Sequence, residues 1–220
     1  MLPVYKVICE GVSECNYLLH LQRVLNALPF PEGCFAPLRL IASPKRLDPK
    51  TLKNIGVGSG IYGNVISDYQ SEFKNNKTVP FIVWVDDDIY VRNDHDCQVN
   101  YNAKPSGIPD FSFSVHNFED FLALHHPDDK FEEWKREFAC TTHFNQPLHS
   151  VDYMPHYLKV FPDYRKGELP DGFITAETLK NMIRRGCELP LMTSGSLNVT
   201  RTFVADLSRI LCTVYPDVFR

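Results

Sequence analysis

PFIVWVDDDIY, residues 80–90, is a short apolar run that ends in Asp86, Asp87 and Asp88. The run has the length and the β-branched and aromatic composition of a fully buried strand. Three carboxylates at its exit repel one another, so a bound cation would stabilise them. Side chains alternate along an extended chain, so Asp86 and Asp88 point the same way and Asp87 the opposite way. We therefore expect Asp86 and Asp88 to act as a pair of ligands for a hard divalent metal.

The length and composition are typical of one medium-sized globular domain, or of a core domain with a smaller appendage. The chain has 220 residues, of which 44% are hydrophobic and 23% charged. It contains neither an apolar run of membrane-spanning length nor a secretory signal pattern, so we expect a cytoplasmic protein with no membrane association.

Seven cysteines are scattered along the chain, and no two are spaced as C-x-x-C. This favours reduced thiols over a disulfide framework. His95 with Cys97 and Cys140 with His143 are pairs of potential zinc ligands, but neither pair has a convincing second pair. The net charge of −4 does not exclude nucleic acid, because acids gathered at a metal site lower the total.

The first half of the chain alternates between strand and helix patterns. Val4–Cys9 predicts a strand, followed by Glu10, Gly11 and a helix for which Ser13 is the expected N-cap. A second strand over 38–42, a helix over 61–73 and the 80–85 strand follow. This order predicts right-handed crossovers and a mostly parallel sheet with helices on both faces, an α/β fold.

The second half is predicted to be mainly helical. After a fourth strand over 111–115, Asn117 caps a helix that runs to His125. Further helices are expected around 131–138, from a cap at Thr175 to Gly186, and after Asn198, with a Pro- and Tyr-rich connection over 154–170. We expect a catalytic core over 1–126 and a helical extension over 127–220 packed on it.

Acidic side chains follow two of the predicted parallel strands. Ligands of open parallel sheets gather outside the carboxyl ends of the strands. If the first and third strands are neighbours, Glu10 converges with Asp86 and Asp88. Such carboxylates could hold one or two Mg²⁺ ions, or Mn²⁺ in their place, with positions left open for phosphate oxygens.

Two motifs in this order resemble a known family. A strand followed by Glu-Gly and a helix, and a later strand followed by Asp-x-Asp, are similar to the Toprim domain of topoisomerases, bacterial primases and overcoming-lysogenization-defect (OLD) nucleases. More narrowly, the chain resembles the RloB-like family over about residues 4–126. The matching positions are Cys9, Glu10, Gly11, Ser13, Glu14 and Tyr17, and then Phe118, Glu119, Phe121, Leu122 and His125.

The resemblance implies a Toprim/Rossmann-like sheet and a Mg²⁺-dependent nuclease of bacterial anti-phage defence, often encoded beside an ATPase partner. The family's Asn-Pro before Phe-Glu is absent here, where His116 and Asn117 stand instead. The family pattern Asp-Arg-Asp-Glu is also replaced by Asp-Asp-Asp-Ile. The substrate, DNA or RNA, and the oligomeric state are left open.

The expected catalytic set is Glu10, Asp86, Asp88, Glu119 and His125. Asp86 and Asp88 bind metal, and Glu10 binds metal or shuttles a proton. Glu14 could add a further carboxylate for metal, or be a surface acid favoured by a helix N-terminus. The same alternative holds for Glu119. His125 could contact phosphate or a catalytic water, or have a core or capping role.

Basic residues supply candidate contacts for nucleic acid. The pairs are Lys45 with Arg46 and Arg165 with Lys166. A solvated basic surface is the alternative for each pair. The second pair follows Tyr164, and an aromatic ring beside a basic cluster could stack on a base.

Two rival functions remain open from the sequence. Gly58, Gly60 and Gly63 form G-x-G-x-x-G before a helix, as in dinucleotide-binding Rossmann proteins. That fingerprint needs an apolar strand running into its first glycine, whereas Lys53 and Asn54 interrupt the preceding segment. The other rival is a non-catalytic Toprim-like partner or sensor subunit of an ATPase.

Overall fold

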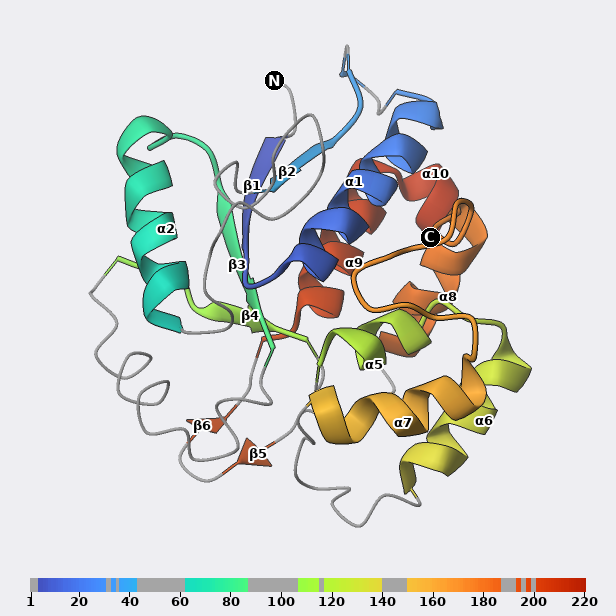
Figure 1. Ribbon diagram of the computed structural model, residues 1–220. Coiled ribbons are helices and arrows are strands. Elements are labelled where there is room, and N and C mark those ends of the chain that lie inside the picture. The colour runs from blue at the N-terminus through green and yellow to red at the C-terminus, as the bar shows by residue number, and fades with distance from the viewer. Residues whose placement is uncertain are drawn as a thin grey trace.

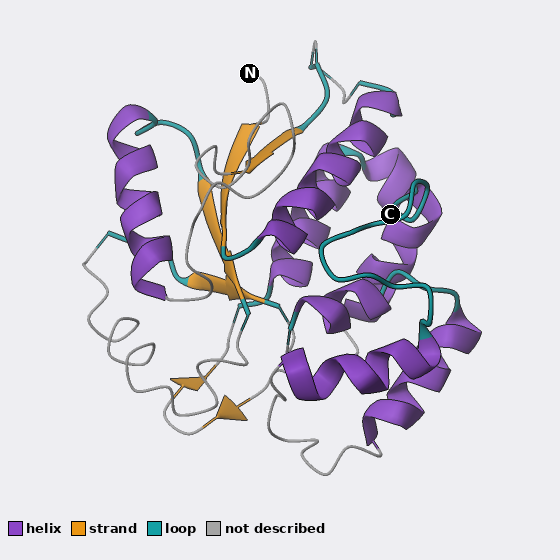
Figure 2. Ribbon diagram, in the orientation of Figure 1, coloured by secondary structure: helices purple, strands orange, loops and turns teal. Residues whose placement is uncertain are grey.

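The computed structural model describes residues 4–30, 33–34, 36–42, 62–86, 107–114, 117–139, 150–186, 193–194, 197–198 and 201–220. Its centre is a four-stranded parallel sheet of order β2-β1-β3-β4 (Figure 1). The strands are β1 (Val4–Cys9), β2 (Arg39–Ala42), β3 (Phe81–Val85) and β4 (Phe111–Phe113). Helices flank the sheet on both sides (Figure 2), which confirms the predicted α/β class.

The two crossover helices cover opposite faces of this sheet. Helix α1 (Val12–Ala27) joins β1 to β2, and α2 (Tyr62–Asn75) lies between β2 and β3 in the chain. In Figure 1, α2 stands on one side of the strands and α1 on the other. The chain thus moves outward from β1 to β2, then returns across β1 to β3. The order of the strands reverses between β1 and β3.

Alternation along the strands divides the apolar side chains between these two faces. Ile8, Val83 and Val85 pack with α2, whereas Val7 and Trp84 belong to the larger cluster on the α1 face. Every residue of β3 is buried, as its unbroken apolar sequence predicts for a central strand covered on both sides.

The remaining helices lie on the α1 side of the sheet (Figure 1). They are α5 (Phe118–Ala123), α6 (Asp128–Ala139), α7 (Ser150–Val160), α8 (Ala176–Gly186), α9 (Phe203–Val214) and α10 (Pro216–Phe219). A short antiparallel pair, β5 (Thr193–Ser194) and β6 (Leu197–Asn198), precedes α9. No helix within these described ranges is long and apolar enough to cross a membrane.

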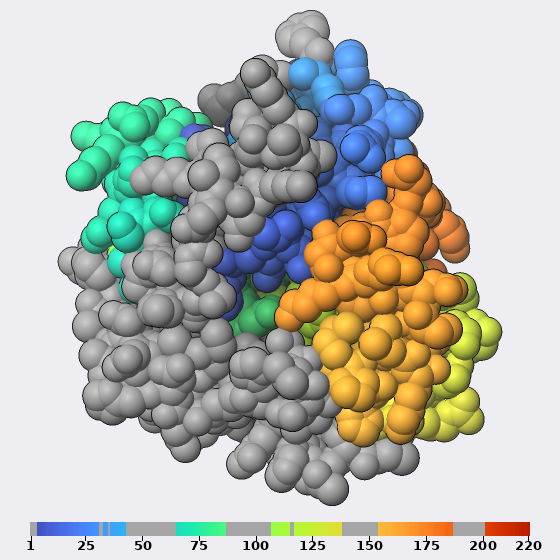
Figure 3. Space-filling view, viewed as in Figure 1, coloured from blue at the N-terminus to red at the C-terminus, as the bar shows by residue number. Residues whose placement is uncertain are grey.

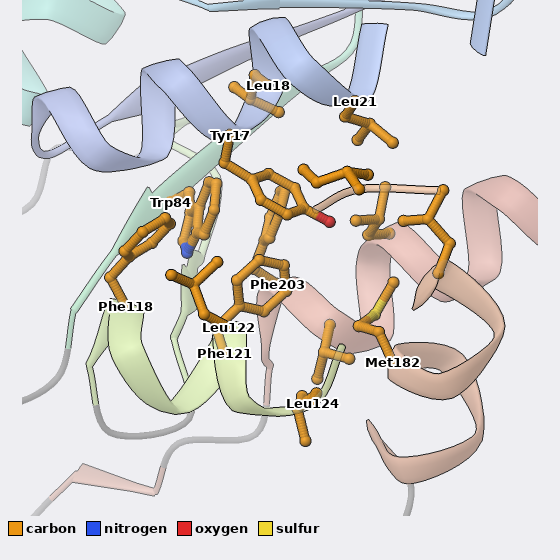
Figure 4. Packing of buried hydrophobic residues seen from close by; sticks show 14 of the residues in the cluster. Tyr17, Leu18, Leu21, Trp84, Phe118, Phe121, Leu122, Leu124, Met182 and Phe203 are labelled. Carbon is orange, nitrogen blue, oxygen red and sulfur yellow. The ribbon is translucent and has the colours of Figure 1, made fainter. Parts of the chain in front are cut away.

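The C-terminal helices share one hydrophobic core with the sheet. Phe203 of α9 stacks on Trp84 of β3, with ring centroids 3.7 Å apart and planes 9° apart. Figure 4 shows Tyr17, Phe118 and Phe121 gathered around Trp84, and Phe121 also meets Phe203. The backbone N–H of Phe113 also donates to the carbonyl of Arg201 at 3.1 Å. The boundary expected near residue 126 therefore does not separate two cores.

Helix termini confirm two sequence predictions and correct two others. Asn117 Oδ1 accepts the N–H of Asp120 at 3.2 Å, and Thr175 Oγ1 accepts the N–H of Thr178 at 3.1 Å, so both residues are caps as expected. Ser13 is not the N-cap of α1, because that helix begins earlier and Gly11 takes the position. The 154–170 segment is not a connection from its start, because it begins inside α7, which carries Pro155 within the helix.

Candidate active site

Glu10 and Asp86 lie together at the carboxyl ends of two adjacent parallel strands. Strands β1 and β3 pair in register, with Cys9 opposite Trp84. The backbone N–H of Glu10 donates to the carbonyl of Trp84 at 3.2 Å, and the N–H of Asp86 donates to Glu10 Oε2 at 2.9 Å. The Glu10 side chain is only 9% exposed and Asp86 is half-buried. The expected convergence of the first and third strands is confirmed.

The position of this pair in the sheet is the one at which open α/β folds bind ligands. Strand order reverses between β1 and β3, and α1 and α2 leave toward opposite faces. The helices therefore leave the carboxyl ends of these two strands toward opposite faces, which is the arrangement at which open α/β sheets bind ligands. Glu10 and Asp86 stand at this topological switch point.

Glu14 folds back onto the turn between β1 and α1. A Cβ atom added at Gly11 would lie 2.8 Å from Glu14 Oε2, so the carboxylate lies against the glycine backbone. Glu14 is 4% exposed and occupies the first turn of α1, where the helix dipole favours a negative charge. Gly11 therefore supplies the space that lets a second buried carboxylate lie close to the Glu10 turn.

Glu119 is a third buried acid, in the first turn of α5, with 2% of its surface exposed. Its Oε1 accepts the Tyr164 hydroxyl at 3.1 Å. Burial raises the pKa of Glu119, and the positive charge of Lys166 opposes that rise. Burial and then the negative charge of Glu119 raise the pKa of Tyr164, and Glu14 adds to this effect. The negative charges of both buried glutamates therefore act on the Tyr164 hydroxyl.

The segment after α7 is held beside these acids by contacts to two helices. Tyr164 contacts α5 through Glu119, and Asn16 of α1 donates through Nδ2 to the carbonyl of Gly167 at 2.5 Å. Gly167 has φ of +83°, which a residue with a side chain rarely adopts. Arg165 and Lys166 are exposed in this turn. The predicted basic cluster therefore lies next to the acidic residues.

The face that carries these residues is hollowed. Figure 3 shows blue atoms from the start of the chain, green atoms from its middle and orange atoms from the segment after α7 meeting around a depression. Asn16 and Tyr164 border the site, and neither was among the predicted site residues. The only sequence signal for Tyr164 was its position before Arg165 and Lys166, and Asn16 had none.

His125 corrects an expectation from the sequence. Its side chain has no exposed surface, so it does not contact phosphate or a surface water in this structure. The Phe121 carbonyl can only accept, so Nδ1–H donates to it at 3.2 Å, and Nε2 accepts the Tyr17 hydroxyl at 2.9 Å. Burial lowers the pKa of His125 to about 3, so the ring is neutral. His125 therefore belongs to the core that supports α1 and α5.

Several predicted site residues lie outside the described residues. They are Asp88, Lys45, Arg46, Gly58 and Gly60, and the same holds for Asp87 and for both histidine–cysteine pairs considered as zinc ligands. Within the part of the chain that is described, no group of three or more His, Cys, Asp or Glu side chains is placed to hold a metal ion. The donor chemistry of Glu10 and Asp86 nevertheless suits a hard cation, because both supply carboxylate oxygens. Any further ligand from the triple aspartate belongs to the undescribed segment.

Comparison with protein-family models, with curated proteins and with solved structures gives no match to this chain.

The geometry argues against the dinucleotide-binding rival. In that fold the phosphate-binding glycines follow the central strand at the switch point. Here the turn after β1 carries Glu10 and Glu14, whose buried carboxylates would repel a pyrophosphate in the absence of a cation. The glycine motif follows the edge strand β2 instead, and its last glycine, Gly63, lies within α2.

Proposed function

We propose that this protein is a Mg²⁺-dependent nuclease that hydrolyses phosphodiesters of DNA or RNA. The observation that carries the proposal is the pairing of Glu10 and Asp86 at the switch point of a parallel sheet, joined by the 2.9 Å bond from the Asp86 N–H to Glu10 Oε2. Two more buried acids lie in the first turns of the neighbouring helices α1 and α5. The resemblance of the Glu-Gly and Asp-x-Asp segments to Toprim and RloB-like proteins supports the same chemistry.

In this proposal Glu10, Asp86 and Asp88 hold the ion, and Mn²⁺ could replace Mg²⁺. A bound divalent ion would neutralise phosphate charge and lower the pKa of a coordinated water. The hydrogen bond from the Asp86 N–H to Glu10 Oε2 orients the Glu10 carboxylate at the carboxyl end of β3, where an ion held by Asp86 would lie. Glu14 adds negative charge to the Glu10 turn.

The segment after α7 that carries Tyr164, Arg165 and Lys166, the Tyr164 segment, would supply the contacts to the substrate. Lys166 and Arg165 are exposed and lie beside buried acids, so they offer positive charge to a phosphate that approaches the metal. Glu119 is held by the Tyr164 hydroxyl, and burial favours its protonated form. It is therefore suited to donate a proton or to position the segment that carries Lys166.

The biological setting follows from the same resemblance. We propose action in bacterial anti-phage defence, in the cytoplasm, with an ATPase as partner protein. An alternative within this setting is a non-catalytic subunit whose site binds metal without turnover. Metal binding in the absence of cleavage, with and without the ATPase, would favour that alternative.

Cleavage and metal binding are measured separately to test the proposal. The full chain is incubated with single-stranded DNA, double-stranded DNA and structured RNA in Mg²⁺, Mn²⁺ or chelator, while calorimetry follows Mn²⁺ binding in the absence of nucleic acid. Glu10→Gln and Asp86→Asn are expected to abolish both. Glu177→Gln is the matched control, because Glu177 is an exposed acid in the first turn of α8. Metal-dependent cleavage that survives both site substitutions would refute the site.

A further inference from the structure

A pocket of about 350 Å³ lies beside the acidic site, between α5, α6, α7 and the segment that follows α7. This volume is near the lower end of the range for small-molecule sites, about 300–1,000 Å³. Most of its lining is apolar, and rings form much of it. The rings are those of His126, Tyr157, Phe161, Tyr164 and Phe173.

The rings hold one another in fixed orientations. His126 stacks on Phe161 with centroids 3.9 Å apart and planes 20° apart, and Phe173 meets His126 edge-on at 5.1 Å. Tyr157 lies 4.5 Å from Phe161 and meets Tyr164 edge-on at 5.0 Å. A pocket walled by ordered ring faces and edges suits a flat aromatic ligand, which gains stacking energy without first reorganising the protein.

The polar groups of the lining favour an uncharged ligand with hydrogen-bonding edges. Lys130 and Asp163 contribute opposite charges, so the lining carries no net charge from them. Burial lowers the pKa of His126 to about 4, so its neutral ring has one donor and one acceptor nitrogen. A phosphate would find little net attraction here. A nucleobase, neutral and edged with donors and acceptors, matches both the rings and the polar groups.

Tyr164 joins this pocket to the candidate active site. Its ring lines the pocket, while its hydroxyl donates to Glu119 at 3.1 Å and Lys166 follows two residues later. We propose that the pocket binds an unpaired nucleobase of the substrate, next to the phosphate that Lys166 and the acidic residues engage. This inference rests on the proposed nuclease function and specifies its substrate as nucleic acid with an unstacked, single-stranded base.

Nucleosides test the pocket independently of the metal site, because they carry no phosphate. Adenosine, guanosine, cytidine and uridine are titrated into the full chain in chelator by calorimetry. Tryptophan fluorescence is the second signal, since the ring of Trp134 lies 5.4 Å from the pocket residue Tyr157. At least one nucleoside is expected to bind saturably. Phe173→Leu is expected to weaken that binding about ten-fold through lost stacking.

Two further variants keep the test decisive. Leu169→Trp places a large ring at a pocket-lining position and is expected to block binding even if Phe173→Leu is tolerated or unstable. Phe73→Leu is the matched control, because Phe73 is 38% exposed on α2, on the opposite face of the sheet. Failure of every nucleoside to bind, or binding that Leu169→Trp leaves unchanged, would overturn the pocket assignment.

Cleavage assays separate this inference from the proposed function. Metal-dependent cleavage that Asp86→Asn abolishes and Leu169→Trp leaves unchanged would overturn the nucleobase pocket while the nuclease site stands. Nucleoside binding that Leu169→Trp abolishes, with neither Mn²⁺ binding nor cleavage in any metal, would support the pocket and refute the metal-dependent nuclease. Slower cleavage of single-stranded substrate by Leu169→Trp, with Mn²⁺ binding unchanged, is the result expected if both are correct.

Discussion

The burial of His125 predicts a measurable loss of stability in acid. The ring has no exposed surface and its pKa is lowered to about 3 from the value of 6.5 for an unperturbed histidine. Between these values the unfolded chain binds a proton at this residue that the folded protein does not. Stability therefore falls as the pH drops below about 6.5. At about pH 5 this single residue costs roughly 2 kcal/mol relative to about pH 8.

The test compares urea unfolding of the wild type and His125→Gln from about pH 8 to about pH 5. Glutamine does not titrate, so the variant is expected to be less stable at about pH 8 but to lose roughly 2 kcal/mol less on acidification. Glu119 has a raised pKa, which makes stability fall as the pH rises, but it is present in both proteins and cancels in the difference. Parallel pH profiles would refute a buried neutral His125. They would restore the sequence-based expectation that the ring is accessible to substrate.

Three other substitutions test the site and its support. Gly11→Ala is expected to displace the Glu14 carboxylate, because Glu14 Oε2 would lie 2.8 Å from the new Cβ. The variant should bind Mn²⁺ more weakly in calorimetry, while its free energy of unfolding should fall by only about 1 kcal/mol. Tyr164→Phe removes the donor to Glu119 and is expected to cost roughly 1–3 kcal/mol in urea unfolding and to slow cleavage; unchanged values for both would contradict the proposed link. Arg185→Met is expected to cost about 3 kcal/mol in urea unfolding, because it leaves the carbonyls of Leu124 and His126 without the buried guanidinium that donates to both. Mn²⁺ affinity is expected to be retained.

The acids of the site are buried for different physical reasons. Glu10 is held by a backbone N–H from the neighbouring strand, so its position depends on the pairing of β1 with β3. Glu14 and Glu119 each lie in the first turn of a helix, where partial positive charge offsets part of the cost of burial. Metal binding at Glu10 and Asp86 is therefore expected to depend on correct strand pairing more than on either helix.

Much of the secondary structure was predictable from short-range sequence patterns. The unbroken apolar run before Asp86 indicated a strand buried on both faces, and β3 is buried throughout. The caps Asn117 and Thr175 were predictable because a side-chain oxygen before a helical pattern satisfies the free N–H groups of the first turn. Ser13 failed as a cap by the same logic, because Gly11 allows the helix to begin sooner and the glutamate to fold back against it.

His125 shows a feature of the structure that short-range sequence patterns could not predict. A histidine near the end of a short helix has the same local sequence whether it faces solvent or core. The Tyr17 hydroxyl that donates to His125 Nε2 lies 108 positions away in the sequence, and no local periodicity indicates that contact. The same holds for the bond between Tyr164 and Glu119, which are 45 positions apart.

The sequence by itself determined that an apolar strand ends in carboxylates, that Glu10 ends another strand, and that the fold alternates strand and helix, because these are properties of local composition and spacing. Only the tertiary structure decided that β1 and β3 are neighbours, so that Asp86 donates to Glu10 across the pair. It also decided that the Tyr164 segment returns to α1 and α5, and that His125 is buried. Each of these outcomes depends on contacts between segments that are distant in the sequence. The energy of such contacts comes from strand pairing and from burial of apolar surface, which arise only when the segments meet in the folded chain.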